Sequence, residues 1–590
     1  MSRENIPSGS RQLRQCTLDD FLRPTQHHNN NDKKNNMNNN NTTRPSLDTE
    51  AEKRRRINGD GDASNNINSS SRDIPNTNTI ILPWSEDNRF IKETGDVCQA
   101  WDIITNIIAN DNSTNTEDLR RLLQSLLVHN SNTGDSPLPQ FDTICFVLDH
   151  IMLPLESADF FNVTLPWMKC LVLNGPRVIP HNQLPMLTQR ETRRLVFTYE
   201  EVITLMSCGF FSLFPGRLSK KGFERGKKVG AFNFVDLLSL IPSNRRESQF
   251  AKVRCLLQYF IYCSHNRESV KTGLELYRVS FSSSFPNFHS STAFMQPITM
   301  YADGFIEESY GHLQIDFANK VVGGGVLRTG CVQEEIRFIT YPELILSQLV
   351  CDSLRDNEVL FMSGAGQYSV TEGYANSFRF LHGNTPEYIT IRNEKSLQGY
   401  NQKMVELVTS NVQREETNGD PILLRNCCVV AMDAVSYTGD INKQYTLRYI
   451  VREIRKAFVA FKGIPDSTLL SVHSGPIATG NWGCGAFQGD YELKVMIQWC
   501  AASQAGRSLI YFTFGNHDLC CKFQRVYEKL QREAWTVGHV FVVLVMFGQS
   551  CEQRSSLSLS SSSGLSSSQL SGKLFDYILS TPRWRCLSIR

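Results

Sequence analysis

The strongest constraint on the fold is an alternation between short β-rich runs and helical patterns in the second half of the chain. The runs expected as strands are 276–281, 313–317, 359–363, 427–434, 469–472 and 509–514. The patterns expected as helices are 342–352, 447–461, 493–505 and 521–535. Such alternation predicts an α/β sandwich, with a mixed sheet covered by helices on both faces. Ligands of open α/β sheets bind beyond the carboxyl ends of the strands, where the glycine-rich segments of this chain fall.

The part of the chain before this alternation, residues 79–265, is predicted to be mainly helical. Two sets of apolar residues recur there with the spacing of one helix face, and they are Leu119, Leu122, Leu123, Leu126 and Leu127, and Phe250, Val253, Leu256, Leu257 and Phe260. Thr198, followed by Glu201, predicts a capped helix start. The aromatic residues of segment 208–215 are expected in the core, and Pro215 is expected to end that helix.

The two ends of the chain have biased compositions. Residues 1–78 are Asn-rich and are expected to be a disordered regulatory tail, and residues 549–590 are expected to be a Ser-rich, low-complexity tail. The formal net charge of +2 argues against a globally basic binder of nucleic acid. The longest apolar run, 539–547, is too short to cross a bilayer. The 17 cysteines lack paired metal-ligand spacing, so we expect reduced thiols in a soluble intracellular protein that carries no metal.

The glycines Gly323–Gly325 and the acids Glu334 and Glu335 form the first candidate site. Successive glycines let the backbone approach a ligand closely, and exposed N–H groups can bind an anion. A carboxylic acid beside a bound phosphate suggests cleavage of a bond in a phosphorylated sugar. We expect the two acids to point in opposite directions, one to the reacting bond and one to a substrate hydroxyl. The alternative is a surface turn followed by an acidic pair at a helix start.

A second glycine-rich loop, 480–489, precedes the helical pattern that begins near Leu493. Glycines just before a helix place N–H groups and the positive end of the helix dipole at an anion. Any tight turn could explain one such loop, but two loops could clamp a diphosphate between them.

The spacing from Gly323–Gly325 to Gln333-Glu334-Glu335, together with segment 313–319, resembles the signature of the poly(ADP-ribose) glycohydrolases. Segments 478–487 and 208–215 are similar to the diphosphate loop and the helical accessory portion of that family. The resemblance implies a macrodomain-like catalytic domain at 266–548 behind a helical accessory domain at 79–265. It implies hydrolysis of ribose–ribose O-glycosidic bonds in poly(ADP-ribose), with release of ADP-ribose and no cofactor.

The resemblance also implies roles for individual residues. Glu335 would be the general acid that protonates the departing 2′-oxygen and then the base that activates water. Glu334 would bind ribose hydroxyls. Asp316, counted with the two glutamates as catalytic, would hold the catalytic loop or the ribose, as would Asn319. Ile306 and Glu307 would lie on the adenine side, where Tyr374 packs, and Phe514 near a ribose. The other implied ligand contacts are Asn319, Gly323, Gly324, Gly325, Gln333, Asn481, Trp482, Gly483, Cys484, Gly485, Ala486 and Phe487.

Two short motifs in the N-terminal tail indicate partners and localisation. The first resembles the peptide that docks on the replication sliding clamp, proliferating cell nuclear antigen, and consists of Gln15, Leu18, Phe21 and Leu22. The second, Lys53–Arg56, is typical of a nuclear import signal and leaves a cytoplasmic pool open. A chance match and a solvated charge run are the alternatives. The function would be polymer turnover in the DNA-damage response. The alternatives are a non-catalytic ADP-ribose reader and a clamp-recruited repair scaffold.

Overall fold

The computed structural model describes residues 79–91, 97–130, 137–215, 232–241, 243, 246–267, 273–309, 312–386, 388–391, 422–425, 427–462, 476–558 and 573–586. The clamp-like motif, the basic cluster 53–56 and the strand expected at 469–472 lie outside these ranges. They stay predictions.

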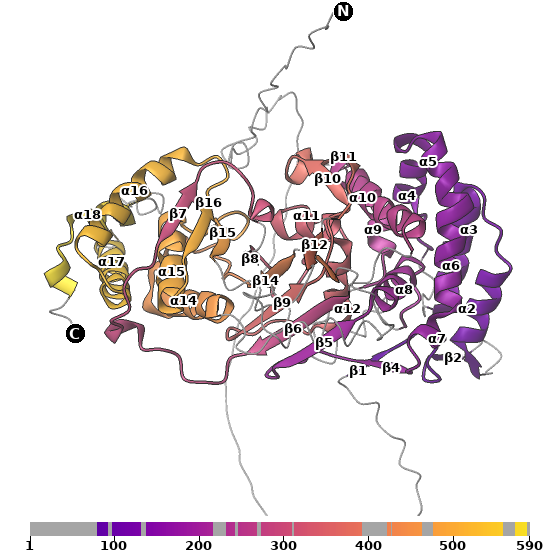
Figure 1. Ribbon diagram of the computed structural model, residues 1–590, viewed down its shortest axis with the longest axis horizontal. Coiled ribbons are helices and arrows are strands. Elements are labelled where there is room, and N and C mark those ends of the chain that lie inside the picture. The colour runs from indigo at the N-terminus through magenta and orange to yellow at the C-terminus, as the bar shows by residue number, and fades with distance from the viewer. Residues whose placement is uncertain are drawn as a thin grey trace, which may run out of the picture. The chain divides into compact units, whose positions relative to one another are not determined.

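A mixed sheet of eight strands forms the centre of the described structure (Figure 1). Its order is β5-β6-β9-β14-β8-β15-β16-β7. The five strands from β14 to β7 run parallel, and β5, β6 and β9 run antiparallel to their neighbours. The strands are β5 (Arg193–Phe197), β6 (Leu274–Ser280), β9 (Glu358–Ser363), β14 (Cys428–Ala431), β8 (Leu313–Asp316), β15 (Ile477–Gly480), β16 (Leu509–Phe512) and β7 (Ile298–Tyr301). The predicted mixed sheet is confirmed.

Three strands of this sheet were not predicted. β5 lies inside the region that was expected to be helical, yet it pairs with β6 along its whole length. β7 and β15 have only four residues each. β15, with the sequence Ile-Ala-Thr-Gly, lacks the apolar side chains on which strand prediction depends. It is buried nonetheless, because β8 and β16 pair with its edges and the layers on both faces of the sheet cover its side chains.

Smaller antiparallel pairs join β1 (Thr79–Ile81) with β4 (Gln183–Pro185) and β2 (Arg89–Ile91) with β3 (Val97–Gln99). Two further pairs join β10 (Ser369–Glu372) with β11 (Arg379–Gly383) and β12 (Tyr388–Ile391) with β13 (Ile422–Arg425).

Both faces of the central sheet are buried, as alternate residues of one strand show. In β14, Val429 and Ala431 belong to a first hydrophobic core, which also contains the buried residues of the N-terminal helices. Cys428 and Val430 belong to a second core, which contains the buried residues of the later helices. Successive side chains of a strand point to opposite faces. The predicted sandwich with helices on both faces is therefore confirmed.

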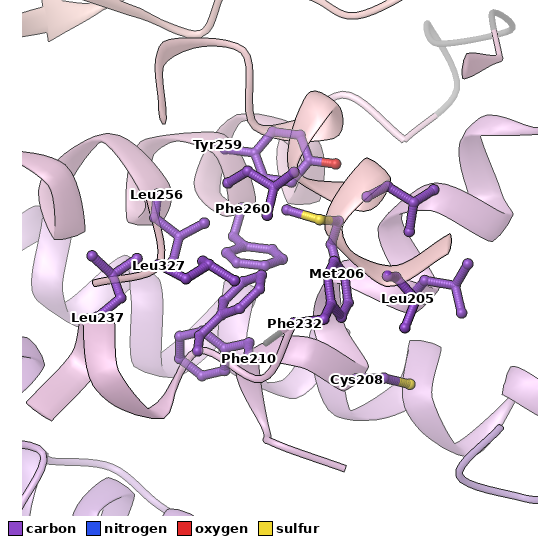
Figure 2. Close-up of a cluster of buried hydrophobic side chains, with 14 of the residues drawn as sticks. Leu205, Met206, Cys208, Phe210, Phe232, Leu237, Leu256, Tyr259, Phe260 and Leu327 are labelled. Atoms are coloured by element: carbon purple, nitrogen blue, oxygen red, sulfur yellow. The ribbon is translucent and has the colours of Figure 1, made fainter. Parts of the chain in front are cut away.

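The first core confirms the predicted helix faces. All five leucines of the 119–127 stripe and all five residues of the 250–260 stripe are at most 3% exposed. Thr198 caps α8, because its hydroxyl accepts the N–H of Glu201. Figure 2 shows Phe210 and Phe232 in this core, and it also places Leu327 there, beside Leu256. The helices before the catalytic segment are α2 (Ala100–Ala109), α3 (Thr116–Asn130), α4 (Asp142–Phe146), α5 (Pro154–Asp159), α6 (Leu165–Leu173), α7 (Gly175–Val178), α8 (Tyr199–Phe210), α9 (Val235–Ser239) and α10 (Arg246–His265).

The later helices need two corrections. The helix expected at 342–352 is a 3₁₀ segment, Pro342–Leu346, followed by one turn of α12 (Ser347–Val350). Two parts of the segment expected as a C-terminal tail, 549–590, are helical, because α17 continues to Ser558 and α18 buries Leu574 and Ile578 in the second core. The remaining helices are α11 (Gln333–Thr340), α14 (Leu447–Lys462), α15 (Tyr491–Gln504), α16 (His517–Arg532), α17 (Val537–Ser558) and α18 (Leu574–Ser580).

No helix within the described ranges has the length and apolar character that a bilayer crossing requires. No group of His, Cys, Asp and Glu side chains is arranged to hold a metal ion within those same ranges.

Glu275 gives the fold a testable pH dependence. Its side chain is fully buried on β6, 3.6 Å from the Arg194 guanidinium. Burial raises the pKa of Glu275 to about 7, although Arg194 opposes the shift. In the unfolded chain the pKa of this carboxyl is about 4.3. Between these two values the folded state keeps a proton that the unfolded state has lost, so the free energy of unfolding falls as the pH rises.

Glu275→Gln removes this titration while keeping the side-chain shape. We expect the free energy of unfolding of the variant, relative to the unmodified protein, to rise by roughly 2–3 kcal/mol between pH 5 and pH 8. Urea denaturation at a series of pH values measures it. Glu528→Gln, at an exposed position of α16, is the control. A relative stability that stays constant with pH would contradict the buried, protonated carboxyl.

Candidate active site

The candidate residues gather at the edge of the sheet where β8, β15 and β16 end. Asp316 is the last residue of β8, and the chain then passes through the glycine segment into α11. The loop after β15 contains residues 481–489, and Phe514 follows β16. Because these strands are parallel, their following loops meet at one edge.

Glu334 and Glu335 lie in the first turn of α11, and both face the glycine segment. Glu334 accepts the N–H of Gly323 at 2.6 Å and the N–H of Asn319 at 2.9 Å, one on each carboxylate oxygen. Glu335 accepts the N–H of Gly325 at 2.8 Å and that of Val332 at 2.9 Å. The expectation that the two acids point in opposite directions was wrong. A helix start places them about 100° apart, and one loop reaches both.

The glycine N–H groups therefore have a different use from the expected one. Those of Gly323 and Gly325 hold carboxylates, and that of Gly324 bonds to the carbonyl of Val321. A Cβ at Gly324 would lie 2.5 Å from an oxygen of Glu334 and 2.5 Å from an oxygen of Glu335. Gly324 also has a φ of +49°. Glycine is required here so that the backbone can approach both acids.

The helical region holds the glycine-containing loop in place. Lys252 of α10 is buried, and its ammonium group donates to the carbonyls of Arg328 and Gly330, each at 2.7 Å. Leu327 packs into the first core (Figure 2). On the other side, the amide of Gln348 in α12 donates to the carbonyl of Gly324 at 3.1 Å. Sequence reasoning missed Lys252 and Gln348, whose only signal is a polar residue within an otherwise buried helix.

Asp316 is a buried carboxyl without a hydrogen-bond donor. Its side chain is 0% exposed, and neither of its oxygens has a hydrogen-bond partner among the described residues. Burial raises the pKa of Asp316 well above its usual range, and the Arg337 guanidinium opposes the shift while Glu335 and Glu307 add to it. Burial also raises the pKa of Glu334, and the charges of Asp316 and Glu335 raise it further. The two hydrogen bonds that Glu334 accepts from backbone N–H groups lower it.

Arg337 supplies the positive charge of the site and was not predicted. Its guanidinium is buried, donates to the side-chain oxygen of Gln314 at 2.6 Å and lies 3.6 Å from Glu307. It also stacks over the Tyr341 ring, 3.9 Å from the ring centre. Its position two residues after Glu335 is the signal that could have identified it. One guanidinium thus faces several carboxyl groups, which favours keeping protons among them.

Gln333 and Tyr374 flank the start of α11. The side-chain oxygen of Gln333 accepts the N–H of Phe317 at 2.8 Å, which fixes the helix to the end of β8. Tyr374 is 40% exposed, and its hydroxyl lies at the backbone of Gln333. The N–H of Ala375 bonds to the carbonyl of Cys331 at 2.9 Å. Tyr374 therefore offers an exposed ring beside the acids, as a stacking platform requires.

The loop after β15 divides its residues between support and exposure. Asn481 donates to the carbonyl of Thr513 at 3.0 Å, and the fully buried Trp482 donates to that of Met432 at 2.9 Å. Cys484 is also buried, and Gly483 packs against Ala434. These four residues anchor the loop by their side chains or backbone.

The exposed part of this loop is an anion-binding candidate. Gly485 and Ala486 are exposed, and a Cβ at Gly485 would meet no atom within 4 Å. Among the described residues, the N–H groups of Gly485, Ala486 and Phe487 have no hydrogen-bond acceptor. The loop leads into α15, whose start is capped by the Asp490 side chain. Open N–H groups ahead of a helix are suited to a phosphate.

The adenine-side residues lie beside β15 and β16. Ile306 is buried in a small cluster with Ala478 and Phe512, and Phe514 and Phe317 pack against that cluster. Phe514 has a φ of +52° and lies 2.7 Å from the position of a Cβ on Gly480. Glu307 stays partly exposed while it faces Arg337. The structure thus brings every predicted site residue to one edge of the sheet.

Comparison with known proteins identifies relatives along most of this length. Residues 285–521 match the family model described as poly(ADP-ribose) glycohydrolase, macro domain fold, and residues 152–278 match the helical domain of the same family. Poly(ADP-ribose) glycohydrolase 1 of Arabidopsis thaliana is 27% identical over 467 residues, which cover 68% of this chain and 80% of the relative. Poly(ADP-ribose) glycohydrolase 1 of Caenorhabditis elegans is 31% identical over 252 residues, which cover 42% of this chain and 29% of the relative.

Gly324→Ala tests whether the glycine segment positions the acids. The added Cβ would overlap both carboxylates, so we expect the rate of polymer hydrolysis to fall roughly 10²-fold, as small displacements of catalytic groups do. Gly506→Ala is the matched control, because Gly506 has a φ of +73° but open space around its Cβ position. Thermal unfolding should show a loss of stability from the positive φ in both variants and a larger loss in Gly324→Ala, where the Cβ also overlaps the acids. Equal hydrolysis rates in the two would contradict the proposed role of the glycine.

Proposed function

The chain belongs to the poly(ADP-ribose) glycohydrolase family, an enzyme family, and we propose that it cleaves the ribose–ribose O-glycosidic bonds of poly(ADP-ribose) with Glu335 as the acid and base. The observation that carries this proposal is the setting of the Glu335 carboxyl. Two backbone N–H groups fix its orientation, its residue is 7% exposed, and the exposed Tyr374 ring lies beside it.

The first step breaks the bond between C1″ of one ribose and the 2′-oxygen of the next. The protonated Glu335 carboxyl donates its proton to that oxygen as the bond breaks. The departing unit leaves with a 2′-hydroxyl, and the electron pair of the bond stays on its oxygen. Positive charge develops on the sugar that remains, and the Glu335 carboxylate formed by the proton transfer stabilises it.

The second step adds water to C1″. The Glu335 carboxylate takes a proton from the attacking water, the hydroxyl bonds to C1″, and ADP-ribose is released. The acid is thereby returned to its protonated form, so no metal ion or cofactor enters the balance. The same group serves both steps, and the N–H groups of Gly325 and Val332, which hold the Glu335 carboxyl in one orientation, support this assignment.

Glu334 and Asp316 have supporting roles in this proposal. Glu334 is less exposed than Glu335, at 3% against 7%, and it is held more deeply, by Gly323 and Asn319. We assign to it the binding of ribose hydroxyls. Asp316, which is buried and has no hydrogen-bond donor among the described residues, is assigned to keeping a proton in the site, because its charge raises the pKa of the neighbouring Glu334.

The diphosphate is assigned to the open N–H groups of Gly485, Ala486 and Phe487. The adenine is assigned to the Tyr374 ring, on the side of Ile306 and Glu307, and a ribose is assigned to Phe514. These assignments are supported by the exposure of the loop and by the absence of any acceptor for those N–H groups in the described ranges. Backbone amides neutralise a diphosphate without a counter-ion when they converge ahead of a helix.

The site of action in the cell is proposed to be the nucleus, in polymer turnover after DNA damage. The support is the basic cluster Lys53–Arg56 and the clamp-like residues Gln15, Leu18, Phe21 and Leu22, all in the N-terminal tail. Neither motif belongs to the region that matches the family models, which begins at residue 152.

Glu335→Gln tests the acid. The amide keeps the shape of the side chain but cannot transfer the proton, so we expect kcat to fall roughly 10²–10⁴-fold while the Kd for ADP-ribose changes little. Chromatography of digested polymer and calorimetry with ADP-ribose measure the two quantities.

The matched control for this variant is Glu201→Gln. Glu201 also caps a helix start, through the N–H of Thr198, but it lies in α8. It should hydrolyse polymer at the normal rate. Near-normal turnover by Glu335→Gln would contradict the assignment of the acid, and polymer left intact by the unmodified protein would favour a reader.

Deletion of residues 1–78 tests the tail. Because the catalytic residues all lie beyond this segment, the truncated protein should hydrolyse purified polymer at the normal rate in solution. In cells it should no longer accumulate in the nucleus or be recruited to damaged DNA. Fluorescence microscopy of the tagged protein measures both. Normal recruitment of the truncated protein would contradict the assignment of both motifs.

A further inference from the structure

A hollow opens where the segment that follows β8 meets the segment that precedes β9. It has a volume of about 390 Å³ and is lined by Gln189, Lys320 and the segment 353–357. We propose that it is a subsite for the preceding unit of the polymer, the one that leaves, and that Lys320 and Arg355 bind its diphosphate. The inference rests on the proposed function and extends it to the leaving group.

The hollow adjoins the loop that holds the two catalytic acids. Lys320 follows Asn319, whose N–H holds the Glu334 carboxylate at 2.9 Å. The carbonyl of Lys320 accepts the N–H of Leu354 at 2.7 Å, which ties the catalytic segment to the other wall of the hollow. The Gln189 amide donates to the carbonyl of Ser353 at 2.9 Å and closes a third side. The subsite therefore starts one residue away from a group that positions a catalytic acid.

The charges that line the hollow are suited to an anion. Lys320 and Arg355 are both exposed, and within the described ranges neither side chain forms an ion pair. The acid of the lining, Asp356, is already paired with Arg452 at 3.0 Å. Two cations without counter-ions in one hollow leave a net positive charge, which attracts a diphosphate.

The order of the strands gives the direction of the polymer. Along the carboxyl edge the order is β16, β15, β8, β14 and β9. Phe514 and the open N–H groups of Gly485–Phe487 follow β16 and β15, on one side of β8. Because β9 runs antiparallel to β14, its first residue, and with it the segment 353–357, lies at the same edge on the other side. A terminal unit that spans from Phe514 to Glu335 sends the next unit toward Lys320 and Arg355.

The test compares the double variant Lys320→Gln/Arg355→Gln on two substrates. One is purified poly(ADP-ribose), and the other is ADP-ribose joined through C1″ to an uncharged aryl alcohol, which lacks the preceding diphosphate. We expect kcat/KM on the polymer to fall roughly five- to tenfold, the size expected for two exposed charge contacts, and to become less sensitive to salt. On the aryl substrate kcat/KM should change less than twofold.

The control is Lys522→Gln/Arg532→Gln, which removes the same charge from exposed positions of α16. It should leave kcat/KM on the polymer unchanged. Three results would overturn the subsite: an unchanged rate on the polymer, an equal loss on both substrates, or an equal loss in the control. Failure of the unmodified protein to hydrolyse either substrate would instead overturn the proposed function, and the subsite with it.

Discussion

The site depends on four backbone N–H groups that hold two buried carboxylates. Burying an unpaired carboxylate is costly, and hydrogen bonds from backbone amides offset that cost. Gly323, Gly325 and Asn319 supply three of these N–H groups, and Val332 supplies the fourth. The loop can reach both acids only because Gly324 has no side chain. Among the described residues, the position of the acids is thus fixed by backbone N–H groups.

The rest of the fold holds this loop in place. The loop begins at the end of β8 and ends at the start of α11. The helical region holds the middle of the loop, through the hydrogen bonds of Lys252 and the packing of Leu327. This explains why the helical region and the sheet form one hydrophobic core on that face. The helical region is therefore part of the catalytic scaffold, because its buried lysine bonds to the loop that orients Glu335.

The sequence was sufficient to predict the sandwich and the site segments, because both depend on local patterns. Leucines at helical spacing, the Thr198 cap and the glycine and glutamate motifs carry their signal within about ten residues. The missed features depend on distant contacts. β15 is buried by its neighbours and not by its own side chains, and Lys252 meets its partners 76 and 78 residues away. The direction of the two acids was missed because it depends on where α11 begins.

The measurement that tests this account most directly is a crystal structure of the protein with ADP-ribose bound. We predict that the N–H groups of Gly323 and Gly325 remain on Glu334 and Glu335, and that the diphosphate lies within hydrogen-bond distance of the Gly485, Ala486 and Phe487 N–H groups. A diphosphate bound by the N–H groups of Gly323 and Gly325, with both carboxylates released from the loop, would contradict it.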